Sequence, residues 1–118
     1  MPLIFSYGSL REERVQLSTF GRRLEGWADA VVGYERSSVI NDDPETIAFS
    51  GTREHANLVP AESNARVEGM VFEITDAELV RVDEYERRFS YERIDVALAS
   101  GGRAWVYVFA ADTRPSTG

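Results

Sequence analysis

Two short groups of residues in this 118-residue sequence have the types and spacing that chemistry needs. The first is Tyr7-Gly8-Ser9-Leu10, which directly follows an apolar run at the N-terminus. A glycine-containing turn at the end of a strand can direct several backbone N–H groups at one point, and such a nest binds an anion or a carboxylate. The alternative is structural: Gly8 supplies only a turn and Tyr7 only packs. The turn by itself leaves both readings open.

The second is Glu86. It shares a predicted helical stripe with Leu79, Val82 and Asp83 at i, i+3, i+4 and i+7, where core residues are expected. An unpaired buried carboxylate is unfavourable, so such a group finds a partner or takes up a proton. Burial raises its pKa, and a carboxyl that titrates near neutrality suits general acid/base catalysis. The pattern therefore makes Glu86 a candidate catalytic residue.

A surface location for the same carboxylates is the alternative. A charged residue near a helix end often reaches solvent, where Glu86 would pair with Arg87, Arg88 or Arg93. Asp83 and Arg87 are spaced i, i+4, which favours a surface ion pair. The stripe alone does not decide between these readings.

Composition excludes several classes of function. The net charge is -7, and an acidic chain lacks the basic face that nucleic acid or an anionic membrane requires, so we expect neither partner. All 13 basic residues are arginine, which excludes lysine nucleophiles and Schiff bases. There is no cysteine and one histidine, so thiolate chemistry and a histidine-rich metal centre are excluded. We expect no metal and no cofactor.

Two readings of "HANL", residues 55–58, stay open: the stretch reaches a pocket from the middle connection, or the single histidine, His55, is a solvated polar residue, which is the more common case for a lone histidine in a loop. A Ser-His-Asp triad would need His55, yet the chain has no G-x-S-x-G elbow. The N-terminus lacks a basic segment followed by a long apolar run, and no stretch of about 18 apolar residues occurs. With the absence of cysteine, these features are typical of a cytoplasmic protein, the location that we expect.

The elements that would position these residues follow from periodicity. A helix is predicted over 75–87, where Thr75 and Glu78 have capping-box spacing. Gly101-Gly102 predicts a tight hairpin between two strands. Residues 41–45 indicate a turn, 51–65 an irregular connection, and 11–20 either a short helix or a loop. Strands are predicted over residues 3–6, 27–36, 46–50, 66–74, 92–100 and 103–110.

This order predicts an α+β fold: a curled, mostly antiparallel sheet or small barrel with one or two packed helices. The length suits a single domain, which we place at residues 1–112. Residues 113–118 are expected to form a polar tail.

Two blocks of the sequence resemble the gamma-glutamylcyclotransferase-like family, which includes gamma-glutamylamine cyclotransferases and AIG2-like proteins. The first block is "YGSLR" directly after an N-terminal strand. The second is "RVEGMVFEITDAELVRVDEYERRFSYERIDV", residues 66–96, similar to the family's V-x-G strand, its helix ending in L-D-x-x-E, and a following Y-x-R. The closing "AWVYVF", residues 104–109, is also similar. The order of the blocks is more specific than any one motif.

The resemblance implies a reaction and a site. The family cyclises a γ-glutamyl amine or amide to 5-oxoproline and releases the amine, without metal or cofactor, so the implied partner is a small γ-glutamyl substrate. It implies that Tyr7, Gly8, Ser9 and Leu10 hold the glutamyl α-carboxylate and that Glu86 is the catalytic residue. Tyr91 would line the pocket, and Tyr107 would line it or belong to the core.

Two departures from the family pattern bear on this expectation. Arg87 stands where glycine often follows the catalytic glutamate, and a cation there would alter substrate choice or lower the pKa of Glu86. Val82 replaces a common leucine, a mild packing change. Two other functions stay open: a non-enzymatic module that binds a small amino-acid derivative, and a relative that removes a γ-glutamyl protecting group.

Overall fold

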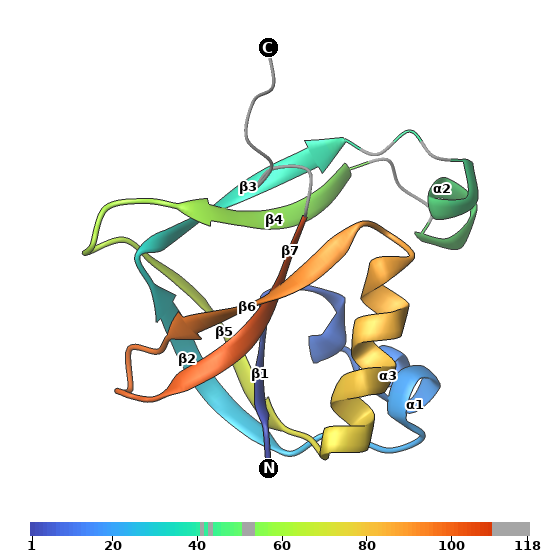
Figure 1. Ribbon diagram of the computed structural model, residues 1–118, viewed down its shortest axis with the longest axis horizontal. Helices are drawn as coiled ribbons and strands as arrows, with labels where there is room; N and C mark the ends of the chain where they lie inside the picture. Colours follow the sequence, from blue (N-terminus) through green and yellow to red (C-terminus); the bar gives the residue numbers. More distant parts are fainter. Residues whose placement is uncertain (41, 43, 51–53, 110–118) are drawn as a thin grey trace.

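The structure, a computed structural model, describes residues 1–40, 42, 44–50 and 54–109 (Figure 1). The predicted polar tail at 113–118, positions 41 and 43 of the predicted turn, and 51–53 of the predicted connection lie outside this part. The described elements, in chain order, are β1 (Leu3–Ser6), the 3-10 helix η1 (Ser9–Arg11), α1 (Glu13–Phe20), β2 (Gly26–Val32), β3 (Tyr34–Ile40), α2 (Pro44–Ser50), β4 (Glu54–Pro60), β5 (Arg66–Glu73), α3 (Asp76–Arg87), β6 (Tyr91–Ala97) and β7 (Arg103–Phe109). This confirms the predicted α+β class.

The main sheet has five strands in the order β2-β5-β1-β7-β6. Its central strand, β1, runs antiparallel to β5 and parallel to β7. The sheet curls until its edges approach, and Val31 near the end of β2 forms an isolated bridge with Leu98 just beyond β6. Over the described residues the five strands form a curled sheet and not a closed barrel (Figure 1).

A second sheet consists of β3 and β4 alone, paired antiparallel along their whole length. The prediction of one strand over 27–36 was wrong because Gly33 divides it. Gly33 has φ 83°, a left-handed conformation that glycine adopts without penalty. There the chain leaves the main sheet, and it returns at Ala61, whose N–H donates to the Gly33 carbonyl at 2.9 Å.

Two further predictions in this region were wrong. Residues 46–50, predicted as a strand, belong to helix α2, which begins at Pro44. Proline suits the first position of a helix, so Pro44 is a signal for a helix start. The strand prediction instead followed the β-branched and aromatic residues of 46–50, which favour a strand. Residues 54–60, predicted as part of an irregular connection, form β4.

The predicted turn over 41–45 is wrong at residues 44–45, which begin α2, whereas the remaining predicted strands and helix are confirmed. Strands β1, β5, β6 and β7 form where periodicity placed them, β6 and β7 pair as the hairpin at Gly101-Gly102, and the ambiguous 11–20 segment contains α1. Helix α3 begins after Thr75 with both bonds of a capping box: the Thr75 side chain accepts from the Glu78 N–H, and Glu78 accepts from the Thr75 N–H.

Packing on both faces of the main sheet fixes the position of α3. One apolar cluster lies between this sheet and the β3–β4 pair, and it includes Phe5, Val71 and Val106. The other lies under α1 and α3, where Val82 is fully buried against residues of β1 and β5. The C-terminal turn of α3 is therefore held beside the chain that leaves β1.

A bidentate ion pair fixes the start of α3. Arg22 donates through Nε and Nη2 to the two carboxylate oxygens of Glu78 at 2.9 and 2.8 Å. These bonds, with the capping box, lower the pKa of Glu78 to about 2 despite its burial. Because the unfolded chain binds this proton more readily, the pair stabilises the fold above about pH 4.5, and its contribution is lost as pH falls toward 2.

We expect Glu78→Gln to lower the free energy of unfolding at pH 7 by about 1–2 kcal/mol, a value reduced for the partial exposure of Arg22. Urea unfolding at pH 7 and pH 3 measures it, and the difference between wild type and variant should shrink at pH 3. A constant difference at both pH values would contradict the assigned ion pair.

Candidate active site

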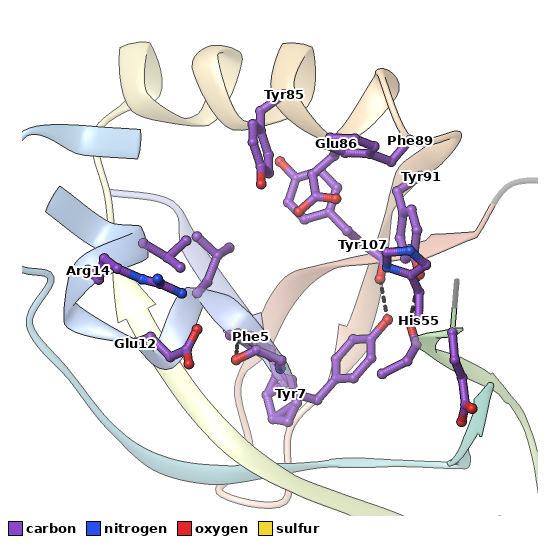
Figure 2. A pocket seen from close by; sticks show the side chains of 16 residues that line it. Phe5, Tyr7, Glu12, Arg14, His55, Tyr85, Glu86, Phe89, Tyr91 and Tyr107 are labelled. Carbon is purple, nitrogen blue, oxygen red and sulfur yellow. Dashed lines mark hydrogen bonds between the residues drawn. The ribbon is translucent and has the colours of Figure 1, made fainter. Parts of the chain in front are cut away.

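A cavity of about 420 Å³ lies between the turn after β1, the end of α3 and strand β4. Figure 2 shows its side chains converging from these separate elements. Its wall is largely aromatic, with charged groups at intervals. The aromatic residues are Phe5, Tyr7, Tyr85, Phe89, Tyr91 and Tyr107, and the charged ones are Glu12, Arg14, Glu54 and Glu86. The curled sheet thus brings together residues from both of the blocks that the sequence singled out.

The predicted binding turn forms one side of this cavity. Tyr7, Gly8 and Leu10 line it. Ser9 begins η1, and for this residue the backbone alone is described. Gly8 has no left-handed φ, and a Cβ added there would meet no atom within 4 Å. The fold itself therefore does not demand glycine at position 8.

The carbonyl groups of the turn are bound by donors from the protein. Arg36 on β3 donates to the Tyr7 carbonyl at 3.0 Å, and Gln16 on α1 donates to the Leu10 carbonyl at 2.8 Å. The Arg11 side chain donates to the Gly8 carbonyl at 3.1 Å. With these three oxygens occupied, a carboxylate that approaches the turn meets less repulsion from acceptors.

Tyr7 connects the turn to the centre of the sheet. Its hydroxyl donates to the Tyr107 carbonyl at 2.7 Å, and the Arg36 guanidinium lies 5.7 Å from its ring centroid. Burial raises the pKa of Tyr7 well above its ordinary value, and the Tyr91 and Glu86 charges add to this. Tyr7 is therefore a neutral phenol that holds the turn in place.

Glu86 lies in the last turn of α3, and its carboxyl points into the cavity (Figure 2). Burial raises its pKa to about 7. Within the described residues, its carboxylate has no hydrogen bond or ion pair. Arg87 is exposed, so the expectation that it lowers the pKa of Glu86 was wrong. The predicted burial of Glu86 is confirmed in part, since the residue is partly and not fully buried.

The predicted surface pair between Asp83 and Arg87 was also wrong. Asp83 accepts a hydrogen bond from the Tyr107 hydroxyl at 2.7 Å and lies 3.5 Å from Arg93. Tyr107 is buried and also lines the cavity, so both expected locations hold for it. The Tyr107 carbonyl accepts from the Tyr7 hydroxyl, and the Tyr107 hydroxyl donates to Asp83, which lies about one helical turn before Glu86. Tyr107 therefore links the turn to the helix that carries Glu86.

The opposite wall comes from β4 and β6. Tyr91 lines the cavity as expected, and its hydroxyl donates to the Ala56 carbonyl at 2.7 Å. Of the two readings of His55, the structure supports the one that brings it to the pocket: His55 lines the cavity, and its Nε2 is buried with no partner among the described atoms. Asn57, two residues further along β4, is fully buried and accepts from the Phe109 N–H at 2.9 Å.

Sequence reasoning missed several lining residues. Glu12 and Arg14 lie at one end of the cavity (Figure 2), and Tyr85 and Phe89 cover it from α3 and the segment after it. No motif marks Arg14, whereas Tyr85 and Phe89 are spaced i, i+4 and pack edge to face with centroids 5.4 Å apart. Their i, i+4 spacing is the feature of the sequence that predicts two aromatic side chains packed together on the face beside Glu86.

The arrangement can perform proton transfer on a small polar molecule. It offers a carboxyl with a pKa raised to about 7 and no partner among the described residues, in the same cavity as the Tyr7–Leu10 turn. Among the described residues, no three His, Asp or Glu side chains are placed to hold a metal ion. None of the described helices is long and apolar enough to cross a membrane.

Solved structures share this fold. A protein from Arabidopsis thaliana is 24% identical with a TM-score of 0.71, covering 98% of this chain and 66% of its own. A structure described as gamma-glutamyl cyclotransferase is 18% identical with a TM-score of 0.67, covering 92% and 66%. The Escherichia coli protein ytfP is 26% identical with a TM-score of 0.60, covering 98% and 87%. The chain spans about two thirds of the length of the first two.

No curated protein matches the sequence. The profile of a family described as "Gamma-glutamyl cyclotransferase, AIG2-like" matches residues 4–118, which include both the turn after β1 and the end of α3. Because this match covers nearly the whole sequence, the chain belongs to the gamma-glutamyl cyclotransferase, AIG2-like family.

Proposed function

We propose that this protein is a γ-glutamyl cyclotransferase that converts a γ-glutamyl amine or amide to 5-oxoproline and releases the amine. The observation that carries the proposal is Glu86: a carboxyl with no partner among the described residues, its pKa raised to about 7 by burial, in the same cavity as the Tyr7–Leu10 turn. Family membership supports the reaction class. The partner is then a small γ-glutamyl compound, and the chemistry requires no metal or cofactor.

The reaction is intramolecular. The free α-amine of the substrate attacks its own γ-carbonyl, a new C–N bond closes the lactam ring, and the original amide C–N bond breaks. The protein must fold the glutamyl group so that the amine and the carbonyl meet. Such orientation can supply about 7–11 kcal/mol of the barrier reduction.

The turn would supply that orientation. In the proposal, backbone N–H groups of Gly8, Ser9 and Leu10 bind the α-carboxylate, and the open space beside Gly8 allows the substrate to approach the backbone. Arg14, a cation in the cavity wall, adds a favourable field for this anion.

Glu86 would move the proton. As a carboxylate it accepts a proton from the attacking ammonium group, and as a carboxylic acid it donates that proton to the departing nitrogen. A pKa near 7 populates both forms at neutral pH, which is the condition that general acid/base catalysis favours. The α-ammonium group loses two protons as it becomes the lactam N–H. Glu86 relays one of them to the departing nitrogen as the C–N bond breaks, and the released amine takes up the second as it becomes an ammonium ion, so the proton count balances.

The test is 5-oxoproline release, measured by mass spectrometry, from a panel of γ-glutamyl amines and dipeptides. We expect product and an equimolar free amine from at least one member. If no member yields product although several raise the melting temperature, the chain is a binding module on the same fold. That alternative needs the turn but has no use for the unpaired Glu86.

A further inference from the structure

His55 brings an unmatched polar atom to the cavity wall. It lies on β4, paired opposite Val39 of β3. Its Nε2 is buried, and no described group forms a hydrogen bond with it. A buried polar atom without a partner is unfavourable, and the few that occur in native proteins need a specific explanation. A ligand atom that bonds Nε2 would remove the penalty.

The contacts around His55 fix its direction. Tyr91 donates to the carbonyl of Ala56, and Asn57 accepts from the Phe109 N–H, so β4 is tied to β6 and β7 at the two following positions. His55 and Asn57 are two residues apart on one strand and therefore share a face. Because Asn57 is fully buried against the main sheet, His55 faces the same way, into the cavity.

His55 lies at the end of the cavity away from Arg14. Figure 2 shows Glu12 and Arg14 at one end, His55 and Tyr91 at the other, and Glu86 between them. The turn runs from Gly8 toward Glu12. A glutamyl group held by the turn, with its γ-carbonyl beside Glu86, would therefore direct its amine substituent toward His55.

Resting on the proposed cyclisation, we infer that His55 selects the leaving amine: its Nε2 hydrogen-bonds a hydroxyl or a second amine carried by the group that departs. An imidazole nitrogen donates or accepts according to its tautomer, and a hydroxyl can match either form. A second ammonium group would also be attracted by Glu54, the neighbour of His55 on β4, which lines the cavity as well. A plain alkyl amine would leave Nε2 unpaired.

Three γ-glutamyl amides that share a four-carbon chain test this inference: those of butylamine, 4-aminobutanol and 1,4-diaminobutane. The readout is kcat/KM for 5-oxoproline release. We expect wild type to prefer the hydroxylated amide and the amide of the diamine to the butyl amide by about tenfold. In His55→Phe, which keeps the ring and removes Nε2, both ratios should fall to about one. His55→Gln, which restores a polar end, should recover part of the preference.

Arg14→Gln is the matched control, because it removes a polar group from the opposite end of the cavity. It should change kcat/KM for the three amides by the same factor and keep their ratios. Equal reaction of all three with wild type, or unchanged ratios in His55→Phe, would overturn this inference and leave the proposed function standing. Absence of 5-oxoproline from every amide would overturn both.

Discussion

Glu86→Gln should lose turnover and gain stability. If Glu86 carries the proton, its loss lowers kcat for 5-oxoproline release by about 10²–10⁴-fold. The same change removes a carboxyl whose ionisation the cavity opposes, because burial raises its pKa from 4.5 to about 7. At pH 8 the variant should therefore be more stable by about 2–3 kcal/mol, a melting temperature higher by on the order of 10 °C.

The pH dependence of this gain follows from the direction of the shift. Between about pH 4.5 and pH 7 the folded protein holds a proton on Glu86 that the unfolded chain has released, so wild-type stability falls as pH rises through this range. Glutamine does not titrate. The two proteins should have equal stability at about pH 4, and the difference should grow until about pH 7 and then stay constant.

Glu84→Gln is the matched control for Glu86→Gln. Glu84 lies on the same helix but is exposed and outside the cavity wall, so the same chemical change should alter neither turnover nor melting temperature by much. If Glu86→Gln keeps full turnover with the expected gain in stability, the carboxyl is buried but not catalytic. If it loses turnover with no gain in stability, the raised pKa is wrong.

In wild type, two carboxyl groups of α3 with shifted pKa values, Glu78 and Glu86, act in opposite directions. Glu78, paired with Arg22, makes stability rise between about pH 2 and pH 4.5, whereas Glu86 makes it fall between about pH 4.5 and pH 7. One helix thus carries a carboxylate at its start that is satisfied by partners, and another at its end that has none within the described part of the chain. Unpaired groups of this kind are typical of functional sites.

Local signals explain what the sequence predicted well. The capping box at Thr75, the apolar stripe of α3 and the glycine pair of the β6–β7 hairpin each lie within a few residues, and all three are present in the structure. The same stripe placed Glu86 on an inward face, and family resemblance connected it with the turn at Gly8. The cavity brings both together.

The failures lie where pairing between distant segments decides the structure. Strand β4 exists because it pairs with β3 across α2, and no local pattern marks its end or its partner. His55 consequently seemed to lie in a polar connection, although the strand turns it into the cavity. The partners of Asp83 could not be predicted for the same reason: Tyr107 is 24 residues away in sequence, and its contact depends on the packing of α3 on the sheet.

Gly8→Val should abolish substrate binding with little change to the fold. Gly8 has no left-handed φ, and a Cβ there would meet no atom within 4 Å, so valine fits the folded protein. Its branched side chain would instead occupy the space through which the proposed carboxylate reaches the backbone. Loss of one or two hydrogen bonds to a carboxylate predicts a fall in kcat/KM of at least about 100-fold.

Gly102→Val provides the matched control. Gly102 also lacks a left-handed φ, and its added Cβ would meet only a Leu98 side-chain carbon at 4.0 Å, but it lies in the β6–β7 hairpin and outside the cavity wall. Both variants should melt near the wild-type temperature, and only Gly8→Val should lose activity, mainly through KM. Wild-type KM in Gly8→Val would show that the substrate does not approach this backbone. The α-carboxylate would then have to bind elsewhere, and Arg14, the cation farther along the same wall, would be the candidate.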